Sequence, residues 1–448
     1  FFFFFIIILE TNNNNNNNNS IVVTHNFESG TRVTNKIKNL LDSPLFKGIE
    51  LHPSRYVTTN LIDSGDCHEY LSSIVTQSRP PVHALFVVTR GRDEQAYTCM
   101  QTWSRRNGQK RIPVQCIKED NAKHNQRLRS ALYCLLTKAN WIPWKIDWKQ
   151  VERPLQLKRK KTMLVGMDIN VNTTEGSAMV GFASTYDPDF VRVHRLVGIE
   201  PMQNDVIPSC DKYLALALDT FHKHNDAYPD QVIFYRCLFF HSFIYLFIRL
   251  PIKLNFVMTA NFFFFKKKAG IRPSALIETI KKEEVSNVKK MLSSKCDEQN
   301  CGLEFVIVQS SAESQFYGEN GAPLTSGTLF SQTFLKNQFF IIPFRIRQGG
   351  QPTPTEFIII EDGLDIIKQC LRHFQTFSYH LFDLYFNDPT YVPHVVKIAN
   401  KLALKYSQSG LREFVVSCDE PICVNDFKIS SDLKNVFVLS FFFFNYQT

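Results

Sequence analysis

Apolar runs and amphipathic stretches alternate through the middle of the chain. The runs HALFVVTR (83–90) and IPVQCI (112–117) have the length and β-branched content of buried strands. Residues 93–107 are compatible with a helix, and residues 125–140 place apolar side chains at clear helical spacing. The order strand, helix, strand, helix predicts a small α/β domain with a parallel sheet.

A second α/β unit follows a polar linker with five basic residues at 152–161. Two apolar strands, 162–171 and 177–186, are separated by a short polar turn, so we expect a hairpin. The further expected strands are 191–197, 231–236, 303–309, 338–346 and 356–362, and the expected helices are 210–224 and 273–292. A mixed sheet that opens with antiparallel strands and then alternates with helices is typical of a ribonuclease H-like fold.

Three segments break this pattern, because they are rich in Phe, Ile, Asn and Lys and contain homopolymer runs: the N-terminus, 237–268 and the tail. We expect the low-complexity residues 1–27 to be disordered. The N-terminus lacks a basic region and a cleavage site for a signal peptide. The longest uncharged apolar run in 237–268 is about twelve residues, short of the roughly twenty that span a bilayer.

The codons of Phe, Ile, Asn and Lys are rich in T or A, so we hypothesise that residues 1–20, 237–268 and the tail are translated non-coding DNA. Sequencing of the mature transcript tests this hypothesis.

Composition narrows the function classes only a little. The net charge of +9 over 448 residues permits an acidic partner such as nucleic acid, but it also fits an ordinary basic protein. Most of the eleven cysteines lie inside apolar runs, as reduced thiols of an intracellular protein do. The pairs in CDEQNC (296–301) and CDEPIC (418–423) allow a four-thiolate zinc site, although coincidence is the favoured interpretation.

Five stretches, in the correct order, resemble the MID and PIWI domains of the Argonaute/Piwi family. They are IPVQCI, MLVGMDIN, YPDQVIFYR, FFIIPFRIRQGGQPTPTEFIII and PTYVPHVVKIANKLA, and the resemblance as a whole covers roughly residues 75–410. The resemblance implies a Rossmann-like MID domain at 81–150 and a ribonuclease H-like PIWI domain at 162–415. Residues 28–80 are then a supporting linker and 416–448 an atypical tail, and no PAZ domain is identified.

The same resemblance implies a pocket for the 5′-phosphate of a guide strand, formed by Tyr97, Gln101, Gln115 and Lys138. A doubly charged phosphate needs several donors in a small space, which an amide and an ammonium supply. At Gln101 the family often has lysine, so we expect weaker phosphate binding here. Taken singly, Tyr97 and Lys138 fit ordinary packing and a helix-end charge.

Slicing members of the family hold two magnesium ions with four side chains, and this chain matches only part of that set. Asp168 falls on the first aspartate, Asp205 on the glutamate, and His394 on the last ligand. The position of the second aspartate is Cys237, or Ala269 if residues 237–268 are absent from the mature chain. Neither side chain replaces a carboxylate on magnesium, so we expect Asp168 and His394 to bind the metal weakly or not at all.

We therefore expect a guide-RNA-binding protein of RNA-mediated silencing, similar to slicing-deficient, nematode-type members of the family. It would act on target RNA through silencing effector proteins, in the cytoplasm or the nucleus and without a membrane. The competing hypothesis is a divergent magnesium-dependent RNA endonuclease that uses Asp168, Asp205 and His394. A third is a non-functional gene product.

Overall fold

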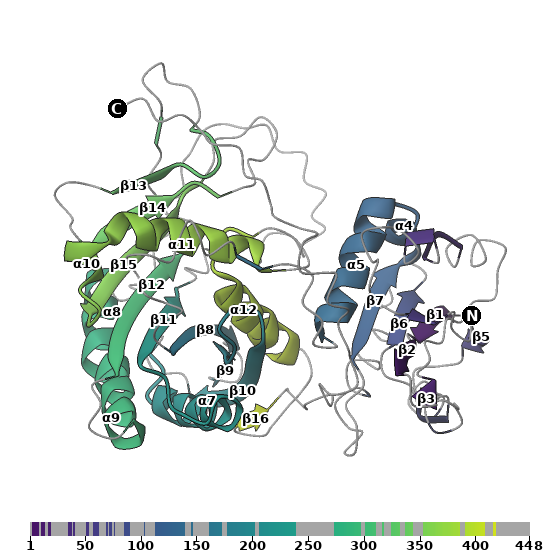
Figure 1. The fold of residues 1–448 in the computed structure, drawn as a ribbon, viewed down its shortest axis with the longest axis horizontal. Helices are drawn as coiled ribbons and strands as arrows, with labels where there is room; N and C mark the ends of the chain where they lie inside the picture. Colours follow the sequence, from purple (N-terminus) through teal and green to yellow (C-terminus); the bar gives the residue numbers. More distant parts are fainter. Residues whose placement is uncertain are drawn as a thin grey trace, which may run out of the picture.

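In the computed structural model the chain forms a small N-terminal lobe and a large C-terminal lobe, each built around its own sheet (Figure 1). The fold is of the expected α/β class, and the sheet of the large lobe is mixed. The structure describes chiefly residues 85–89, 113–138, 161–172, 177–201, 206–238, 273–296, 301–310, 324–331, 337–343, 353–385 and 390–407, with shorter stretches elsewhere.

The small lobe is centred on two parallel strands, β6 (Leu85–Thr89) and β7 (Val114–Lys118). Helix α5 (Asn125–Lys138) covers this sheet with one apolar face, and the short helix α4 (Glu119–Ala122) precedes it. The buried side chains of α5 recur at helical spacing: Leu128, Ala131, Leu132, Leu135 and Leu136. Both strands and the long helix were predicted, whereas the expected helix at 93–107 lies outside the described residues except for Trp103.

The N-terminal segment differs from the expectation of disorder. Strand β1 (Phe2–Ile8) lies between β5 (Val57–Leu61) and β6 and is antiparallel to both. Three more short strands, β2 (Glu10–Asn13), β3 (Asn17–Asn18) and β4 (Leu51–His52), form a separate small sheet. A Phe and Ile run has high β-propensity, and β6 offers it an edge of unpaired backbone groups.

The large lobe contains a nine-stranded sheet with the order β13-β14-β15-β12-β11-β8-β9-β10-β16. Strands β8 and β9 form the predicted hairpin, and β10 pairs antiparallel with β9. Strands β11 and β12 continue the sheet as parallel neighbours of β8. The bounds are β8 (Thr162–Asn172), β9 (Ser177–Thr185), β10 (Val193–Pro201), β11 (Gln231–Cys237), β12 (Gly302–Gln309), β13 (Leu329–Ser331), β14 (Gln338–Ile341), β15 (Thr355–Asp362) and β16 (Val415–Ser417).

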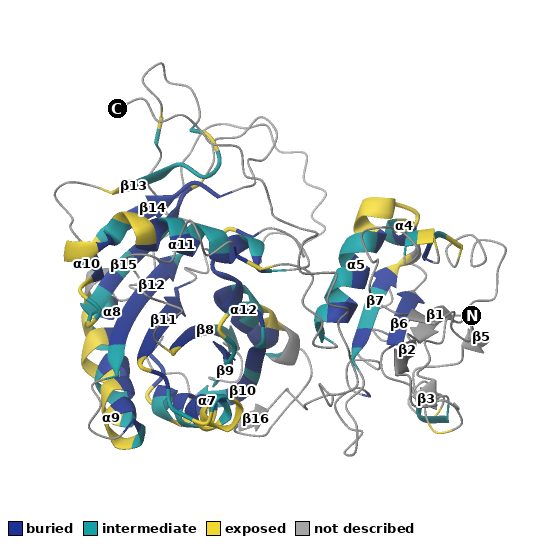
Figure 2. Ribbon diagram, in the orientation of Figure 1, coloured by how far each residue is buried: buried dark blue, intermediate teal, exposed yellow. Residues whose placement is uncertain are grey.

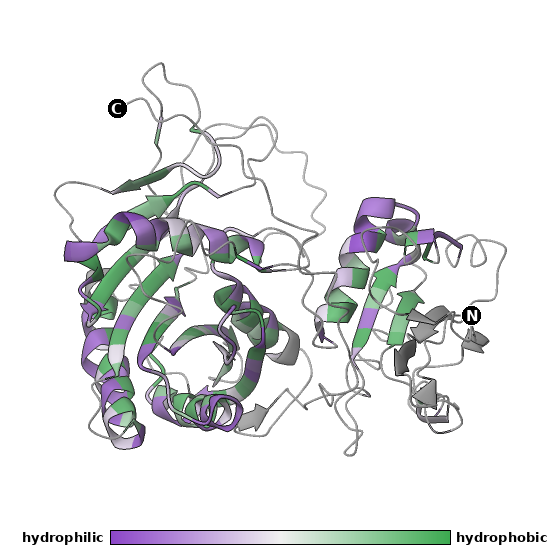
Figure 3. Ribbon diagram, in the orientation of Figure 1, coloured by the Kyte–Doolittle hydropathy of each residue, from purple (hydrophilic) through white to green (hydrophobic). Residues whose placement is uncertain are grey.

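Helices cover both faces of this sheet, so its central strands are buried on both sides (Figures 1 and 2). One face packs against α11 (Leu371–Asp383), preceded by the short α10 (Ile366–Gln369), and α12 (His394–Ser407). The opposite face packs against α7 (Cys210–Asn225), α8 (Pro273–Ile280) and α9 (Ser286–Lys295), with a π-helical turn η3 (Lys281–Val285) between the last two. Figure 3 shows hydrophobic strands beneath helices of mixed polarity.

Alternation along the strands assigns each polar side chain to one face. On β11, Tyr235 and Cys237 belong to the apolar cluster under α11 and α12, whereas Phe234 belongs to the cluster under α7 to α9. By the same alternation Asp168 shares the face of Leu164 on β8. Asp168 and Cys237 therefore lie beneath α12.

Helix α12 is seated directly on β8 and β9. A Cβ atom added to Gly166 would lie 2.4 Å from the carbonyl carbon of Val395. One added to Gly181 would come still closer to the backbone oxygen of Ala399. Only glycine permits so close an approach, and this fixes α12 over the middle of the sheet.

Candidate nucleic-acid site

The carboxylate of Asp168 is fully buried in the middle of β8, and both of its oxygens accept hydrogen bonds from the protein. The side-chain amide of Asn400 on α12 donates to Oδ2 at 2.8 Å. The backbone N–H of Ile169 donates to Oδ1 at 2.9 Å. A buried carboxylate requires such partners, and an amide from the covering helix is one of them.

Cys237, at the position predicted for the second metal-binding aspartate, lies on the neighbouring strand β11. The β8–β11 register pairs Arg236 with Met167, so the next pair brings Cys237 beside Asp168. Burial raises the pKa of the Cys237 thiol well above its usual value, and the charge of Asp168 and a hydrogen bond to its side chain raise it further. The thiol is therefore a protonated donor at neutral pH, in the place where the resemblance implies a second aspartate.

Lys397 adds a positive charge to this group. Its charge lowers the pKa of Cys237, against the larger effect of burial, so the ammonium lies within electrostatic reach of the thiol. Lys397 and Asn400 are three residues apart on α12 and therefore project from the same side of the helix. The ammonium also lies over the ring of Tyr391, at 5.1 Å from its centroid.

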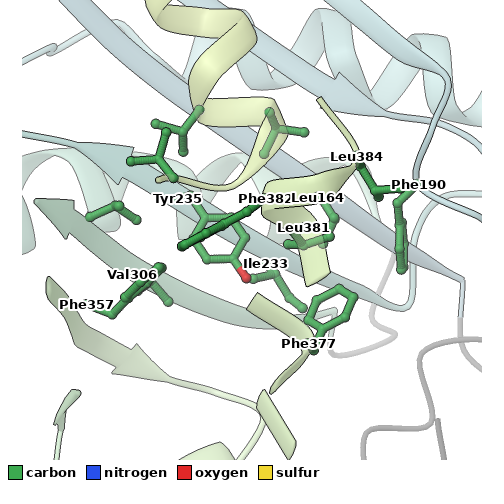
Figure 4. Close-up of a cluster of buried hydrophobic side chains, with 14 of the residues drawn as sticks. Leu164, Phe190, Ile233, Tyr235, Val306, Phe357, Phe377, Leu381, Phe382 and Leu384 are labelled. Atoms are coloured by element: carbon green, nitrogen blue, oxygen red, sulfur yellow. The ribbon is translucent and has the colours of Figure 1, made fainter. Parts of the chain in front are cut away.

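His394, predicted as the last metal ligand, is the first residue of α12. The imidazole is almost fully buried, and burial lowers its pKa to about 4, although the nearby backbones of Phe190 and Leu381 partly favour the charged form. Both neighbours belong to the apolar cluster drawn in Figure 4. Within the described part of the chain, neither ring nitrogen has a partner with ordinary hydrogen-bond geometry.

The residue of α12 that donates a hydrogen bond to Asp168 is Asn400, which was not among the positions predicted from the sequence. Asn400 follows His394 by six residues in the same matched stretch, PTYVPHVVKIANKLA. Helix periodicity gives no means of choosing between the two positions, because the choice depends on where α12 crosses β8.

The described side chains do not fit a pair of magnesium ions. They provide one carboxylate, an amide, a protonated thiol and an ammonium, whereas magnesium prefers several oxygen ligands and repels a nearby cation. No three His, Cys, Asp or Glu side chains of the described residues are arranged to hold a metal ion. The other predicted positions, Asp205 and Ala269, lie outside the described residues.

Two of the four residues predicted for the phosphate pocket contact each other in the small lobe. The ammonium of Lys138 donates to Oε1 of Gln115 and to the backbone oxygen of Val114, both at 2.8 Å. The amide nitrogen of Gln115 donates to the backbone oxygen of Cys116 at 3.0 Å, so the glutamine orients the lysine. Tyr97 and Gln101 lie outside the described residues.

This lysine lies where the two lobes approach each other. Burial lowers the pKa of Lys138, and the charge of Arg195, from β10 of the large lobe, lowers it further. Burial also lowers the pKa of Lys401 on α12, a group that is influenced electrostatically by Cys134 of α5. Cations from both lobes therefore gather near the end of α5, which favours an anionic ligand between them.

Comparisons with known proteins all find Argonaute and Piwi proteins similar to this chain. A family model described as Piwi domain matches residues 85–237, from β6 to the last residue of β11. The chain is 20% identical over 324 residues to Protein argonaute-3 of Drosophila melanogaster, and 20% identical over 388 residues to Piwi-like protein 3 of Homo sapiens. By these matches the chain is similar to Argonaute and Piwi proteins.

Solved structures of Argonaute and Piwi proteins share the fold of this chain. Drosophila Piwi aligns with a TM-score of 0.59 and 16% identity, covering 84% of the chain and 46% of that protein. The C-terminal lobe of a budding yeast Argonaute gives 0.62 and 12%, covering 85% of the chain and 74% of that lobe. Clostridium butyricum Argonaute, solved with a guide DNA and a target DNA, gives 0.61 and 13%, covering 88% and 48%.

The match to the curated relatives is partial. The alignments cover 69% and 81% of this chain but only 32% and 37% of the two relatives, so the chain spans about a third of their length. The Piwi match also runs across the boundary expected between a MID domain at 81–150 and a PIWI domain at 162–415. That division of the chain stays a prediction.

Proposed function

We propose that this protein binds a small guide RNA by its 5′-phosphate and silences target RNA without cutting it. The observation that carries the second half is the set of described residues around Asp168, which are an amide, a thiol and a nearby ammonium rather than further carboxylates. Silencing then depends on recruited effector proteins, in the cytoplasm or the nucleus. Among the described helices, none has the length and apolarity needed to cross a bilayer.

Lys138 supports the guide-binding half of the proposal. Two of its three ammonium donors have protein acceptors among the described residues, so the third remains for a phosphate oxygen. Gln115 and Val114 fix the ammonium, which lowers the entropy lost on binding. The positive charge of Arg195 near Lys138 further favours a doubly charged group there.

Binding is tested with one RNA sequence carrying either a 5′-phosphate or a 5′-hydroxyl, measured by fluorescence anisotropy. We expect about tenfold tighter binding of the phosphorylated RNA, the equivalent of one charge-assisted contact. Lys138→Met should remove the preference while keeping the apolar stem of the side chain. The matched control is Lys123→Ala, which removes an exposed lysine paired with Asp120. Equal affinity for the two RNAs, or an unchanged preference in Lys138→Met, contradicts the proposal.

Cleavage is tested by loading the protein with a guide and adding a fully matched target RNA with magnesium. We expect no specific product from the unaltered protein and the same result for Asp168→Ala. Specific cleavage that disappears in Asp168→Ala would instead establish the competing magnesium-dependent endonuclease. Failure to detect the protein in cells would support the third hypothesis, a non-functional gene product.

A further inference from the structure

Two thiols meet at the end of the large sheet that is remote from Asp168. Cys296 directly follows α9, and its backbone N–H donates to the oxygen of Leu292 at 2.9 Å. Cys301 directly precedes β12. Both side chains pack into the apolar cluster under α7 to α9, and they are joined by a side-chain hydrogen bond.

Hydrogen bonds next to the two thiols connect the beginnings of three strands. Asp230, which precedes β11, accepts from the backbone N–H of Gly302 at 3.0 Å through its own carbonyl oxygen. Its carboxylate accepts from the backbone N–H of Lys161, immediately before β8, at 2.7 Å. A covalent link at Cys301 would therefore connect the end of α9 to the common starting edge of β8, β11 and β12.

We propose that Cys296 and Cys301 form a reversible disulfide, a modification site that constrains the connection between α9 and β12. The two thiols are already in contact, and the six-residue segment CDEQNC from one to the other closes a small ring. The proposal does not depend on guide binding or on the proposed lack of cleavage.

The chemistry is thiol–disulfide exchange with a low-molecular-weight disulfide such as oxidised glutathione. One protein thiolate attacks a glutathione sulfur, forming a mixed disulfide and releasing a glutathione thiolate. The second protein thiolate then attacks the protein sulfur of that mixed disulfide and releases the other glutathione. Two protein thiols are oxidised, one glutathione disulfide is reduced, and the two thiol protons end on the two glutathione molecules.

The local environment sets the rate. The hydrogen bond with Cys296, followed by burial, raises the pKa of the Cys301 thiol, and the charge of Asp230 adds to this. Because only the thiolate attacks, the reaction should be slow at neutral pH and faster in alkaline buffer.

The test treats the purified full chain with oxidised glutathione and maps disulfides by mass spectrometry without reduction. We expect a peptide that contains a Cys296–Cys301 link, and a melting temperature about 5 °C higher, since closing even a small loop restricts the unfolded chain. A reducing thiol should reverse both changes. Cys301→Ser should show neither change, whereas the control Cys370→Ser, altered at a thiol in the opposite apolar cluster, should show both.

Three results would overturn the proposal. One is glutathione retained on Cys296 or Cys301 as a stable mixed disulfide, and another is pairing of either thiol with a different cysteine. The third is stoichiometric Zn²⁺ binding that needs both thiols and blocks oxidation, because the pair would then belong to a metal site. If Cys301→Ser fails to fold, the mapping and the reversible melting shift of the unaltered chain still decide.

Discussion

Single buried polar residues show what the sequence could and could not disclose. A carboxylate within the apolar run MLVGMDIN must be buried and must have partners, so Asp168 was identifiable from sequence. Asn400 was not, because an amide in an amphipathic helix is unremarkable until its partner is known. That partner lies 232 residues earlier in the chain, and only the packing of α12 on β8 brings the two together.

His394 should make the protein sensitive to acid. Its pKa is lowered to about 4 in the folded state, against an ordinary value of 6.5, because the ring is buried. The unfolded chain therefore binds a proton more readily, and the stability present above pH 6.5 is lost as the pH falls through 6.5 towards 4. A depression of this size corresponds to about 3 kcal/mol.

Urea unfolding of the unaltered chain and of His394→Phe, at pH 7, 5 and 4, checks this prediction. Phenylalanine suits the apolar surroundings of Phe190 and Leu381 and does not titrate in this range. The stability difference between the two proteins should shift in favour of the variant as the pH falls. Burial raises the pKa of Asp187 and Asp383 to about 6, which acts in the opposite direction, so the difference is the informative quantity. A stability difference between the two proteins that does not change with pH would contradict the lowered pKa of His394.

At the scale of elements, periodicity predicted most strands and helices of the large lobe, because continuous apolar runs and amphipathic faces are local properties. The π-helical turn η3 was not predicted. It interrupts the single helix expected at 273–292, and within it Glu284 is fully buried against Arg236. Nothing in the local sequence shows that a buried cation lies opposite, so the turn could not be foreseen.

Because α12 packs so closely on the sheet, we expect two glycine substitutions to differ strongly in their effect on stability. Gly181→Ala would drive a Cβ atom into the backbone of Ala399, which cannot move without displacing the helix. We expect a loss of about 2–4 kcal/mol in the free energy of unfolding, as for overpacked or displaced core elements.

The matched control is Gly302→Ala on β12, where the new Cβ would meet the tip of the flexible Leu364 side chain at 2.3 Å. This side chain can rotate, so the cost should stay below about 1 kcal/mol. Chemical denaturation of both variants measures the two values. Similar losses in both would show that α12 is not held at the distance seen here.

For the whole molecule, the sequence indicated two α/β units in the correct order but could not give the order of nine strands. Strand β11 lies between β8 and β12, and β16 joins the edge beside β10. Such pairings connect residues far apart in the chain and depend on packing across both faces. The pairing of β1 with β6 was missed for the same reason, since composition alone favoured disorder.

Residues 237–268 interrupt the large lobe at a point where the structure already joins the two flanks. Arg236, the last residue before them, forms a fully buried ion pair with Glu284, at 3.2 Å from Nε to Oε2. Burial raises the pKa of Glu284 while Arg236 lowers it, and the carboxylate also accepts from the backbone N–H of Ile207 at 2.8 Å. Phe234 and Ile280, from the two flanks, share one apolar cluster.

A chain that lacks residues 237–268 should therefore fold, with Ala269 following Arg236. The flanks are held by burial and by the ion pair, so we expect a stability equal to or above that of the full chain, because a long loop adds closure entropy. Replacing the segment with a Gly/Ser linker of equal length separates the effect of loop length from that of its sequence.

Glu284→Ala gives a reference value for a large loss of stability, since leaving Arg236 buried without its partner should cost about 3–5 kcal/mol. If the deletion costs as much as Glu284→Ala while the linker variant does not, the flanks need the span that these residues provide. If both cost as much, the native residues themselves support the fold, and the hypothesis that they are translated non-coding DNA is wrong.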